Sequence, residues 1–330
     1  MPDKDRYAPY FDTNAPWKGI LAWNTSLMES YLSDTQYIGA TENIDEEGYI
    51  YLGGPLRQNF YQETSGYNHH ITFNYGMNIS DMLYLGINMT AQRIWYSRYQ
   101  EFIEESDTPS LFDTNFEMGR YSFRQNINGV GFNAKFGVIY RPVAGLRIGG
   151  SISTPTWTRY TDETYETMEA KVYEERYMED TPYNTYQYKM TSPFRWNLGI
   201  AYTFGNFALI SADYESTNYS TTKFVVDRYM NTADIEYFNK QNSEMRKSFK
   251  SVHNARVGFE IKPFLGFAIR GGYNYLDYTE WDFNDAMHIA TAGVGYNFKH
   301  GFSIDVAYRQ QCNRIYESYW LYDSDYLKNS

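Results

Sequence analysis

The chain has 330 residues, of which 19% are aromatic, and it carries a formal net charge of -11. This excess of acidic side chains disfavours nucleic acid as a partner, and the aromatic content excludes an intrinsically disordered chain. The mean hydropathy is -0.62, and no apolar run approaches the roughly 18 residues that a membrane-spanning helix needs. Cys312 is the single cysteine, so no intrachain disulfide forms, and the Cys and His spacing supports no zinc site. No cofactor is expected.

Residues 1–55 lack a two-residue alternation and are predicted to be an extracellular loop region with one short amphipathic helix. Pro16 stands where helices favour proline, and apolar residues recur at helical spacing over about 16–33. The apolar stripe of this helix would consist of Trp17, Leu21, Leu27 and Met28. Two interpretations stay open: the stripe packs on aromatic side chains nearby, or it forms a surface binding site for a hydrophobic solute.

A strict alternation of apolar residues with small or polar ones begins near Ile71 and recurs as far as Tyr308. In a β-strand this period places alternate side chains on opposite faces. Strand after strand with one small and polar face is typical of a transmembrane β-barrel. The alternation therefore predicts an all-β fold, an antiparallel transmembrane β-barrel wall of about ten strands within 56–318. A soluble β-sandwich is the other architecture that this composition allows.

Short turns rich in Gly, Pro, Asn and Asp alternate with longer links. Periplasmic turns of outer-membrane barrels are short and extracellular loops are long, so the short turns are expected on the periplasmic side. The short turns are predicted at 80–82, 142–145, 205–206, 263–266 and 299–301. The longer links are predicted at 99–120, 161–185, 221–248 and 282–286. Residues 319–330 are expected to begin a truncated extracellular loop.

The small and polar face of the predicted strands carries charged side chains. A lysine or arginine that faces lipid near the middle of a membrane costs about 2–4 kcal/mol, so this face is expected to point into a lumen. The predicted lumen-lining residues are Lys135, Arg147, Arg256, Arg270, Asp305 and Arg309. The basic side chains would either bind a carboxylate head group or pair with Glu260, Asp213 and Asp305, and both roles are compatible.

Several stretches resemble the OmpP1/FadL/TodX family of outer-membrane transport proteins, with members from Bacteroidetes nearest in pattern. The most telling motifs are Gly-Val-Ile-Tyr-Arg-Pro and Thr-Pro-Thr-Trp, both within 132–157, and the resemblance covers roughly 60–318. It implies a monomeric barrel, which has 14 strands in the complete family fold, with an N-terminal hatch that carries an Asn-Pro-Ala motif. About ten strands fall in this chain, which has no Asn-Pro-Ala motif and opens without a signal peptide. The chain is therefore interpreted as a fragment that lacks the hatch and the C-terminal strand.

The resemblance also implies a function in the bacterial outer membrane. Family members pass long-chain fatty acids or other hydrophobic, including aromatic, compounds inward and release them through a lateral opening in the wall. The expected partners are hydrophobic small molecules, outer-membrane lipid and lipopolysaccharide.

Two other classes of function were weighed. The alternative to transport is a surface protein that binds haem. His69 and His70 are adjacent, but adjacent strand residues point to opposite faces and cannot both ligate one iron. An enzyme is not expected, because the sequence has no Gly-x-Ser-x-Gly motif and neither His253 nor His288 lies in a Ser/Asp context.

Overall fold

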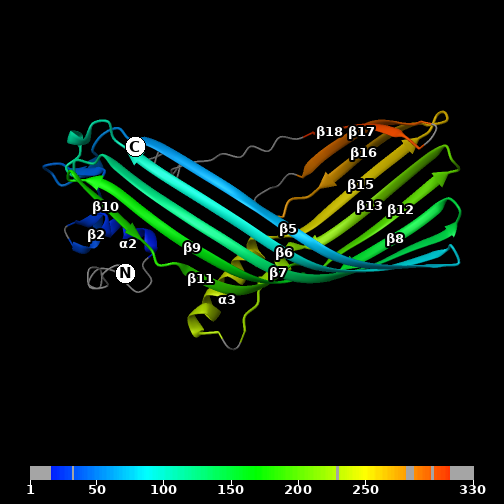
Figure 1. Cartoon of the computed structure of the whole chain (residues 1–330), viewed down its shortest axis with the longest axis horizontal. Helices are drawn as coiled ribbons and strands as arrows, with labels where there is room; N and C mark the ends of the chain where they lie inside the picture. Colours follow the sequence, from blue (N-terminus) through cyan, green and yellow to red (C-terminus); the bar gives the residue numbers. More distant parts are fainter. Residues whose placement is uncertain (1–15, 32, 228–229, 280–285, 299–300, 313–330) are drawn as a thin grey trace. The chain divides into compact units, whose positions relative to one another are not determined.

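The computed structural model describes residues 16–31, 33–227, 230–279, 286–298 and 301–312 (Figure 1). Most of these residues lie in β-strands, and the antiparallel architecture predicted from the alternation is confirmed. Neither α-helix in this part of the chain is long and apolar enough to cross a membrane. The predicted loop at 319–330 lies outside the described residues, as do 1–15 and most of the predicted link at 282–286.

The chain divides into two compact units. Unit 1 comprises Met1–Ile71, Ala91–Gly131 and Thr158–Lys189, and unit 2 comprises Thr72–Thr90, Phe132–Trp157 and Met190–Ser330. Five of the described strands contribute residues to both units. They are β5 (Arg57–Ile79), β6 (Leu83–Glu105), β7 (Met118–Val143), β9 (Trp157–Val172) and β11 (Asn184–Thr191).

Unit 1 also holds several short elements around a small buried core. They are α2 (Trp17–Asn24), β1 (Met28–Tyr31), β2 (Ser33–Gly39), β3 (Glu42–Ile44), β4 (Ile50–Leu52), the 3-10 turn η1 (Pro109–Leu111) and β10 (Glu175–Asp180). The core consists of Ala40, Phe112, Phe116 and Val172, with Leu27, Leu56 and Tyr177 packed against it. Phe112 and Phe116 meet edge to face, with ring centroids 5.7 Å apart, a favoured arrangement for aromatic pairs.

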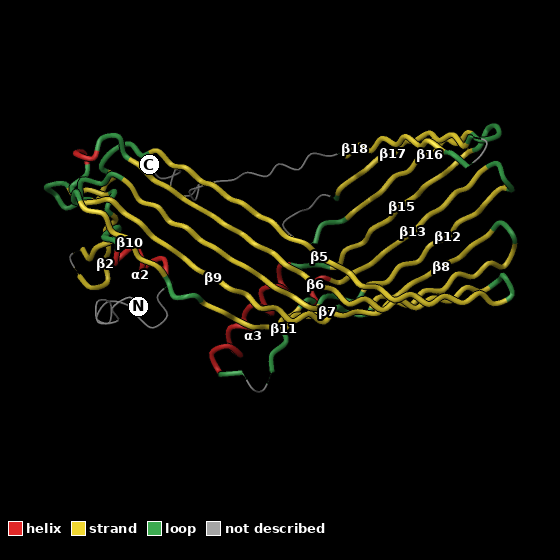
Figure 2. The backbone as a smooth tube through the Cα atoms, viewed as in Figure 1, coloured by secondary structure: helices red, strands yellow, loops and turns green. Residues whose placement is uncertain are grey.

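Unit 2 is mainly a regular meander. Its elements are β8 (Leu146–Ser153), β12 (Arg195–Phe204), β13 (Ala208–Asn218), η2 (Tyr219–Thr221), β14 (Lys223–Phe224), α3 (Thr232–Ser248), β15 (Ser251–Ile261), β16 (Phe267–Leu276), β17 (Met287–Asn297) and β18 (Ser303–Gln311). Figure 2 shows β12, β13, β15, β16, β17 and β18 following one another across the sheet, as their pairings require.

One sheet contains 14 strands. From β7 it runs through β8, β12, β13, β15, β16 and β17 to β18, while β6 and then β5 continue from β7, and β9, β11 and β14 form a second path. The segments between the predicted turns and links at 146–160 and 186–204, each expected to be one strand, are both interrupted, which yields the separate pairs β8 and β9, and β11 and β12. The two interruptions and the short strands β10 and β14 together raise the number of strands in this sheet from the ten or so predicted to 14. Among the described residues no pairing joins β5 to β18, so closure into a barrel stays a prediction.

Each predicted short turn whose residues are all described joins two sequential strands. At the first turn, Ser80 and Asp81 adopt φ values of 55° and 53°, the left-handed conformation that suits tight hairpins. The Asn78 side chain accepts a hydrogen bond from the Asp81 N–H at 3.0 Å and fixes this turn. Residues 299–300 of the last predicted turn lie outside the described residues.

The predicted long links were wrong in three places. Residues 161–185 are not a loop, because β9 and β10 form a hairpin that turns at Tyr173 and Glu174. Strands also extend into 99–120, since β6 ends at Glu105 and β7 begins at Met118, and α3 occupies much of 221–248. Apolar alternation in these segments covers only a few residues, such as Met168, Ala170 and Val172 on β9, so it gave a weak signal for strands.

The predicted helix over about 16–33 was too long. The structure ends α2 at Asn24, where the Thr25 hydroxyl donates a hydrogen bond to the Leu21 carbonyl at 2.8 Å. Ser26 then takes a φ of 55°, which a continuing helix does not allow. Met28 consequently begins β1 instead of completing a helical stripe.

Candidate functional site

One face of the unit 2 sheet is apolar and exposed. The registers bring Leu198 between Gly150 and Tyr214, and Val257 between Ala212 and Tyr273. Leu198 remains 58% exposed and Val257 51% exposed. Exposed apolar area costs about 25 cal/mol per Å² in water, so a contiguous face of this kind requires an apolar covering. Membrane hydrocarbon provides such a covering.

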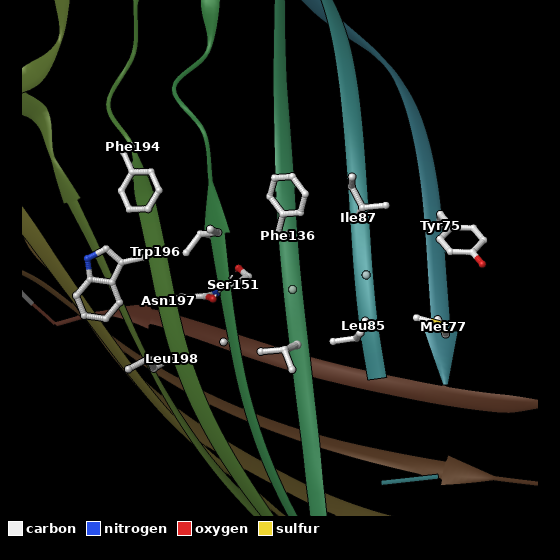
Figure 3. A pocket seen from close by; sticks show the side chains of 15 residues that line it. Tyr75, Met77, Leu85, Ile87, Phe136, Ser151, Phe194, Trp196, Asn197 and Leu198 are labelled. Carbon is white, nitrogen blue, oxygen red and sulfur yellow. Dashed lines mark hydrogen bonds between the residues drawn. The ribbon is translucent and has the colours of Figure 1, made fainter. Parts of the chain in front are cut away.

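A hollow of about 880 Å³ lies on this apolar face (Figure 3). The volume falls within the roughly 300–1,000 Å³ range of small-molecule pockets. Strands β5, β6, β7, β8 and β12 contribute its lining. The labelled apolar side chains around it are Tyr75, Met77, Leu85, Ile87, Phe136, Phe194, Trp196 and Leu198. Such a lining favours hydrocarbon, since each buried methylene contributes about 0.8 kcal/mol.

Two proline-containing interruptions lie side by side next to this hollow. Pro155 separates β8 from β9, and Pro193 separates β11 from β12. Across the two breaks, the Thr156 N–H donates to the Ser192 hydroxyl at 2.9 Å, and the Ser192 N–H donates to the Thr156 carbonyl at 3.0 Å. Proline lacks a backbone donor, and hydroxyl groups complete the hydrogen bonding here in place of a regular ladder. Phe194, just after the second break, lines the hollow.

The opposite face of unit 2 carries ion pairs over small residues. Arg256 lies 3.2 Å from Asp213, Arg270 lies 2.6 Å from Glu260, and Arg270 also contacts Asp305. A second hollow of about 730 Å³ occupies this face, and Gly149, Gly199, Ala201, Ser211, Gly258 and Gly272 are among its lining residues. These pairs are partly exposed, so each contributes about 0–1 kcal/mol while holding the charged groups in fixed positions.

The six predicted lumen-lining residues all fall on this polar face. Arg147, Arg256 and Arg270 line the second hollow, and the predicted pairings of Arg256 and Arg270 with acidic side chains are confirmed. Lys135 lies opposite Ser153, and Arg309 lies opposite Thr291, so both share the face. Whether this face encloses a lumen stays a prediction.

The predicted surface stripe does not hold together as one site. Leu21 is fully buried and therefore cannot contact a solute at the surface. Leu27 packs against the unit 1 core, whereas Trp17 is 40% exposed and Met28 is partly buried. Packing thus explains Leu21 and Leu27, and solute binding by Trp17 and Met28 stays a prediction.

The hollow and the paired interruptions were missed from the sequence. Their signal is a proline inside an alternating run, in Thr-Pro-Thr at 154–156 and Ser-Pro-Phe at 192–194. Proline is rare in the middle of a sheet, and each of these motifs therefore marks a strand break. The adjacency of the two breaks depends on strand pairing, which local pattern does not show. Within the described residues, no group of three or more His, Cys, Asp and Glu side chains is placed to hold a metal ion.

Comparison with known proteins gives the following. No protein-family model and no curated protein matches this chain. Among solved structures, it is similar to the toluene transporter TbuX of Ralstonia pickettii, with 16% identity and a TM-score of 0.46, over 82% of this chain and 68% of that one. It is similar to the P. putida toluene transporter TodX, with 16% identity and a TM-score of 0.45, over 74% and 63% of the two chains. It is also similar to a Pseudomonas aeruginosa FadL homologue, with 14% identity and a TM-score of 0.48, over 76% of this chain and 60% of that one.

The chain thus spans about two thirds of the first of these structures and less of the other two. Their names, TodX and FadL, are those of the family that the sequence motifs resemble.

Proposed function

We propose that this chain forms part of an outer-membrane β-barrel wall through which hydrophobic compounds pass without energy input. The observation that carries the proposal is the two-faced sheet of unit 2. One face presents exposed apolar side chains such as Leu198 and Val257, and the other presents the ion pairs of Arg256 and Arg270. Hydrocarbon outside and a polar interior are the two environments that a membrane-spanning strand separates.

The hollow beside the two interruptions favours a hydrophobic solute over an ion. An ion channel needs a water-filled constriction lined by polar groups along its route, whereas this hollow is lined mainly by Phe136, Phe194, Trp196 and aliphatic side chains. The breaks at Pro155 and Pro193 leave the wall with fewer ladder hydrogen bonds there. We infer that solutes leave the wall sideways at this point, as the family resemblance implies.

The partners proposed are hydrophobic small molecules, together with outer-membrane lipid and lipopolysaccharide around a single copy of the chain. Toluene is the solute of the similar transporters TbuX and TodX. The aromatic lining of the hollow suits monoaromatic rings, and its volume also accommodates an acyl chain.

Permeation into liposomes tests the proposal. The full chain is folded into phospholipid liposomes, and uptake of a fluorescent fatty acid and of toluene is compared with protein-free liposomes. We expect faster uptake with the protein and slower uptake with Trp196→Ala, which removes a ring from the hollow. Tyr237→Ala, which removes an exposed ring from α3, is the control and should leave the rate unchanged. Uptake no faster than in protein-free liposomes would contradict the proposal.

A further inference from the structure

Unit 1 carries a row of exposed basic side chains that the proposed transport does not use. The row consists of His69 on β5, Arg93 on β6 and Arg159 on β9, with Val130 of β7 between the two arginines. Among the residues that the structure describes, neither arginine forms an ion pair or a hydrogen bond. Free arginines are notable in a chain whose formal net charge is -11, because acidic partners are plentiful.

Side-chain contacts fix which residues share this row. The hydrogen bonds Gln58–Glu104 (2.6 Å) and Gln62–Gln100 (2.6 Å) set the antiparallel register of β5 and β6. Counted along both strands, this register places Arg93 directly opposite His69.

Gly131 fixes the rest of the row. Gln92 donates a hydrogen bond of 3.2 Å to the Thr158 hydroxyl, and both side chains lie 2.7 Å from where a Cβ of Gly131 would stand. Residues 92, 131 and 158 therefore form one row on one face of the sheet. Their neighbours Arg93, Val130 and Arg159 form the adjacent row on the opposite face. With strands about 4.8 Å apart, the two arginine backbones lie about 10 Å from each other.

Exposed apolar side chains follow the row along its strands. On β5, Ile71 follows His69 on the same face and is 81% exposed. Two residues beyond Val130 on β7 comes Phe132, and two residues before Arg159 on β9 comes Trp157, both exposed. On the other side of the row, Tyr67 stacks on Trp95 with ring centroids 5.6 Å apart. Aromatic and basic side chains together are typical of the boundary between hydrocarbon and head groups.

We propose that Arg93 and Arg159 clamp a phosphate group in the head group of an outer-leaflet glycolipid, with His69 beside them. This inference rests on the proposed membrane placement of the apolar face. A guanidinium presents a planar set of donors that matches phosphate oxygens in pairs, and the short Val130 leaves the space between the arginines open. The nearest acidic residue on this face of β9, Glu163, is four residues from Arg159, about 13 Å along the strand. A lipid phosphate is the occupant that both the charge and the adjoining apolar face fit.

Lipid retention by the purified full chain tests the proposal. The detergent-solubilised protein is mixed with diphosphorylated lipid A or with its phosphate-free analogue, and bound lipid is counted by native mass spectrometry. We expect the wild type to prefer the phosphorylated lipid by about 30-fold, from the attraction of two basic side chains to anionic lipid. Arg93→Gln with Arg159→Gln should abolish this preference. The control variant, Arg147→Gln with Arg309→Gln, removes the same charge from the polar face of unit 2. This variant should retain the preference for the phosphorylated lipid.

A second variant tests the geometry of the clamp. Val130→Glu places a carboxylate between the two arginines, where it should pair with them and release the phosphorylated lipid. Equal preference in the wild type and the Arg93/Arg159 variant would overturn the proposal. Displacement of the lipid by millimolar inorganic phosphate would also overturn it, since the site would then be a simple anion site.

The transport assay separates this inference from the proposed function. In liposomes without lipid A, the Arg93/Arg159 variant should take up solute at the wild-type rate. If the wild type binds phosphorylated lipid but fails to speed solute uptake, the proposed function falls and the lipid site stands.

Discussion

The assignment of the two faces of unit 2 is tested most sharply on β12, where Asn197 and Leu198 are adjacent. Both contribute atoms to the hollow, but as neighbours in a strand their side chains point to opposite faces: Leu198 lies on the apolar face, and Asn197, opposite Ser151 and Glu215 in the register, lies on the face of the ion pairs. The variants Leu198→Arg and Asn197→Arg therefore place the same charge at one depth in two environments. If the apolar face meets lipid, only the first variant exposes a guanidinium to hydrocarbon.

The structure sets the expected magnitudes. Leu198→Arg should reduce the free energy of unfolding by about 2–4 kcal/mol, the cost of a basic residue that faces lipid near mid-membrane. Asn197→Arg loses the 2.7 Å hydrogen bond from Ser151, which contributes about 0.5–1.5 kcal/mol. It gains attraction to Glu215, which lies opposite in the register and contributes about 1 kcal/mol in water. The second variant should therefore stay within about 1 kcal/mol of the wild type.

Urea unfolding of the protein folded into phospholipid vesicles provides the assay. The denaturant slope should stay constant among the variants, so that midpoint shifts report stability alone. The Leu198 variant should shift the folding equilibrium by roughly 30- to 700-fold. Equal losses in the two variants, or a larger loss for Asn197→Arg, would refute the assignment of the apolar face to lipid.

Three further predictions concern unit 1 and the interruptions. Burial and a hydrogen bond to Glu166 raise the pKa of Tyr121 in the folded protein. The protonated Tyr121 therefore stabilises the fold below its unfolded pKa of about 10, and this stabilisation is lost as the pH rises toward the folded pKa. Stability should therefore fall above about pH 10 less steeply in Tyr121→Phe, as chemical unfolding between pH 9 and 12 would show; equal slopes would refute this. Pro155→Ala with Pro193→Ala restores two backbone donors and should slow solute uptake in liposomes, whereas an unchanged rate would count against release at the breaks. Gly131→Ala places a Cβ 2.7 Å from the side chains of Gln92 and Thr158, which bond to each other across this glycine. It should lower the free energy of unfolding, measured by thermal unfolding, by about 1–3 kcal/mol; a variant as stable as the wild type would contradict the proposed register.

The sequence predicted the strands of unit 2 well because a sheet with one apolar and one polar face imposes a period of two. Segments such as 196–204 and 255–261 must keep apolar side chains on one face, so their positions could be read directly. The interruptions at Pro155 and Pro193 could not be placed in space in the same way. Alternation resumes after each proline, and only strand pairing shows that the two breaks are neighbours.

The α3 helix was missed for a different reason. Phe238 is the one buried side chain of this helix, whose sequence accordingly has little apolar periodicity. Its start nevertheless carries a local signal, because Asn231 accepts a hydrogen bond from the Asp234 N–H at 2.8 Å as an N-cap. A search for capping residues would have found this helix where a search for amphipathic periodicity did not.

Strand length explains why the sequence predicted unit 2 better than unit 1. A strand needs about 9–11 residues to cross the hydrocarbon of a membrane, yet β5 contains 23. Its apolar alternation begins at Ile71, which is also the last residue of unit 1 in this strand. On β7, Phe132 is the first residue of unit 2, and the exposed apolar side chains begin at Val130 on the same face. In the proposed membrane placement, strand residues on the unit 1 side of these boundaries do not face hydrocarbon, so little selects a continuous apolar face there. The basic row of His69, Arg93 and Arg159 lies on the unit 1 side of this change, which in the proposed membrane placement is the level where acyl chains give way to phosphate groups.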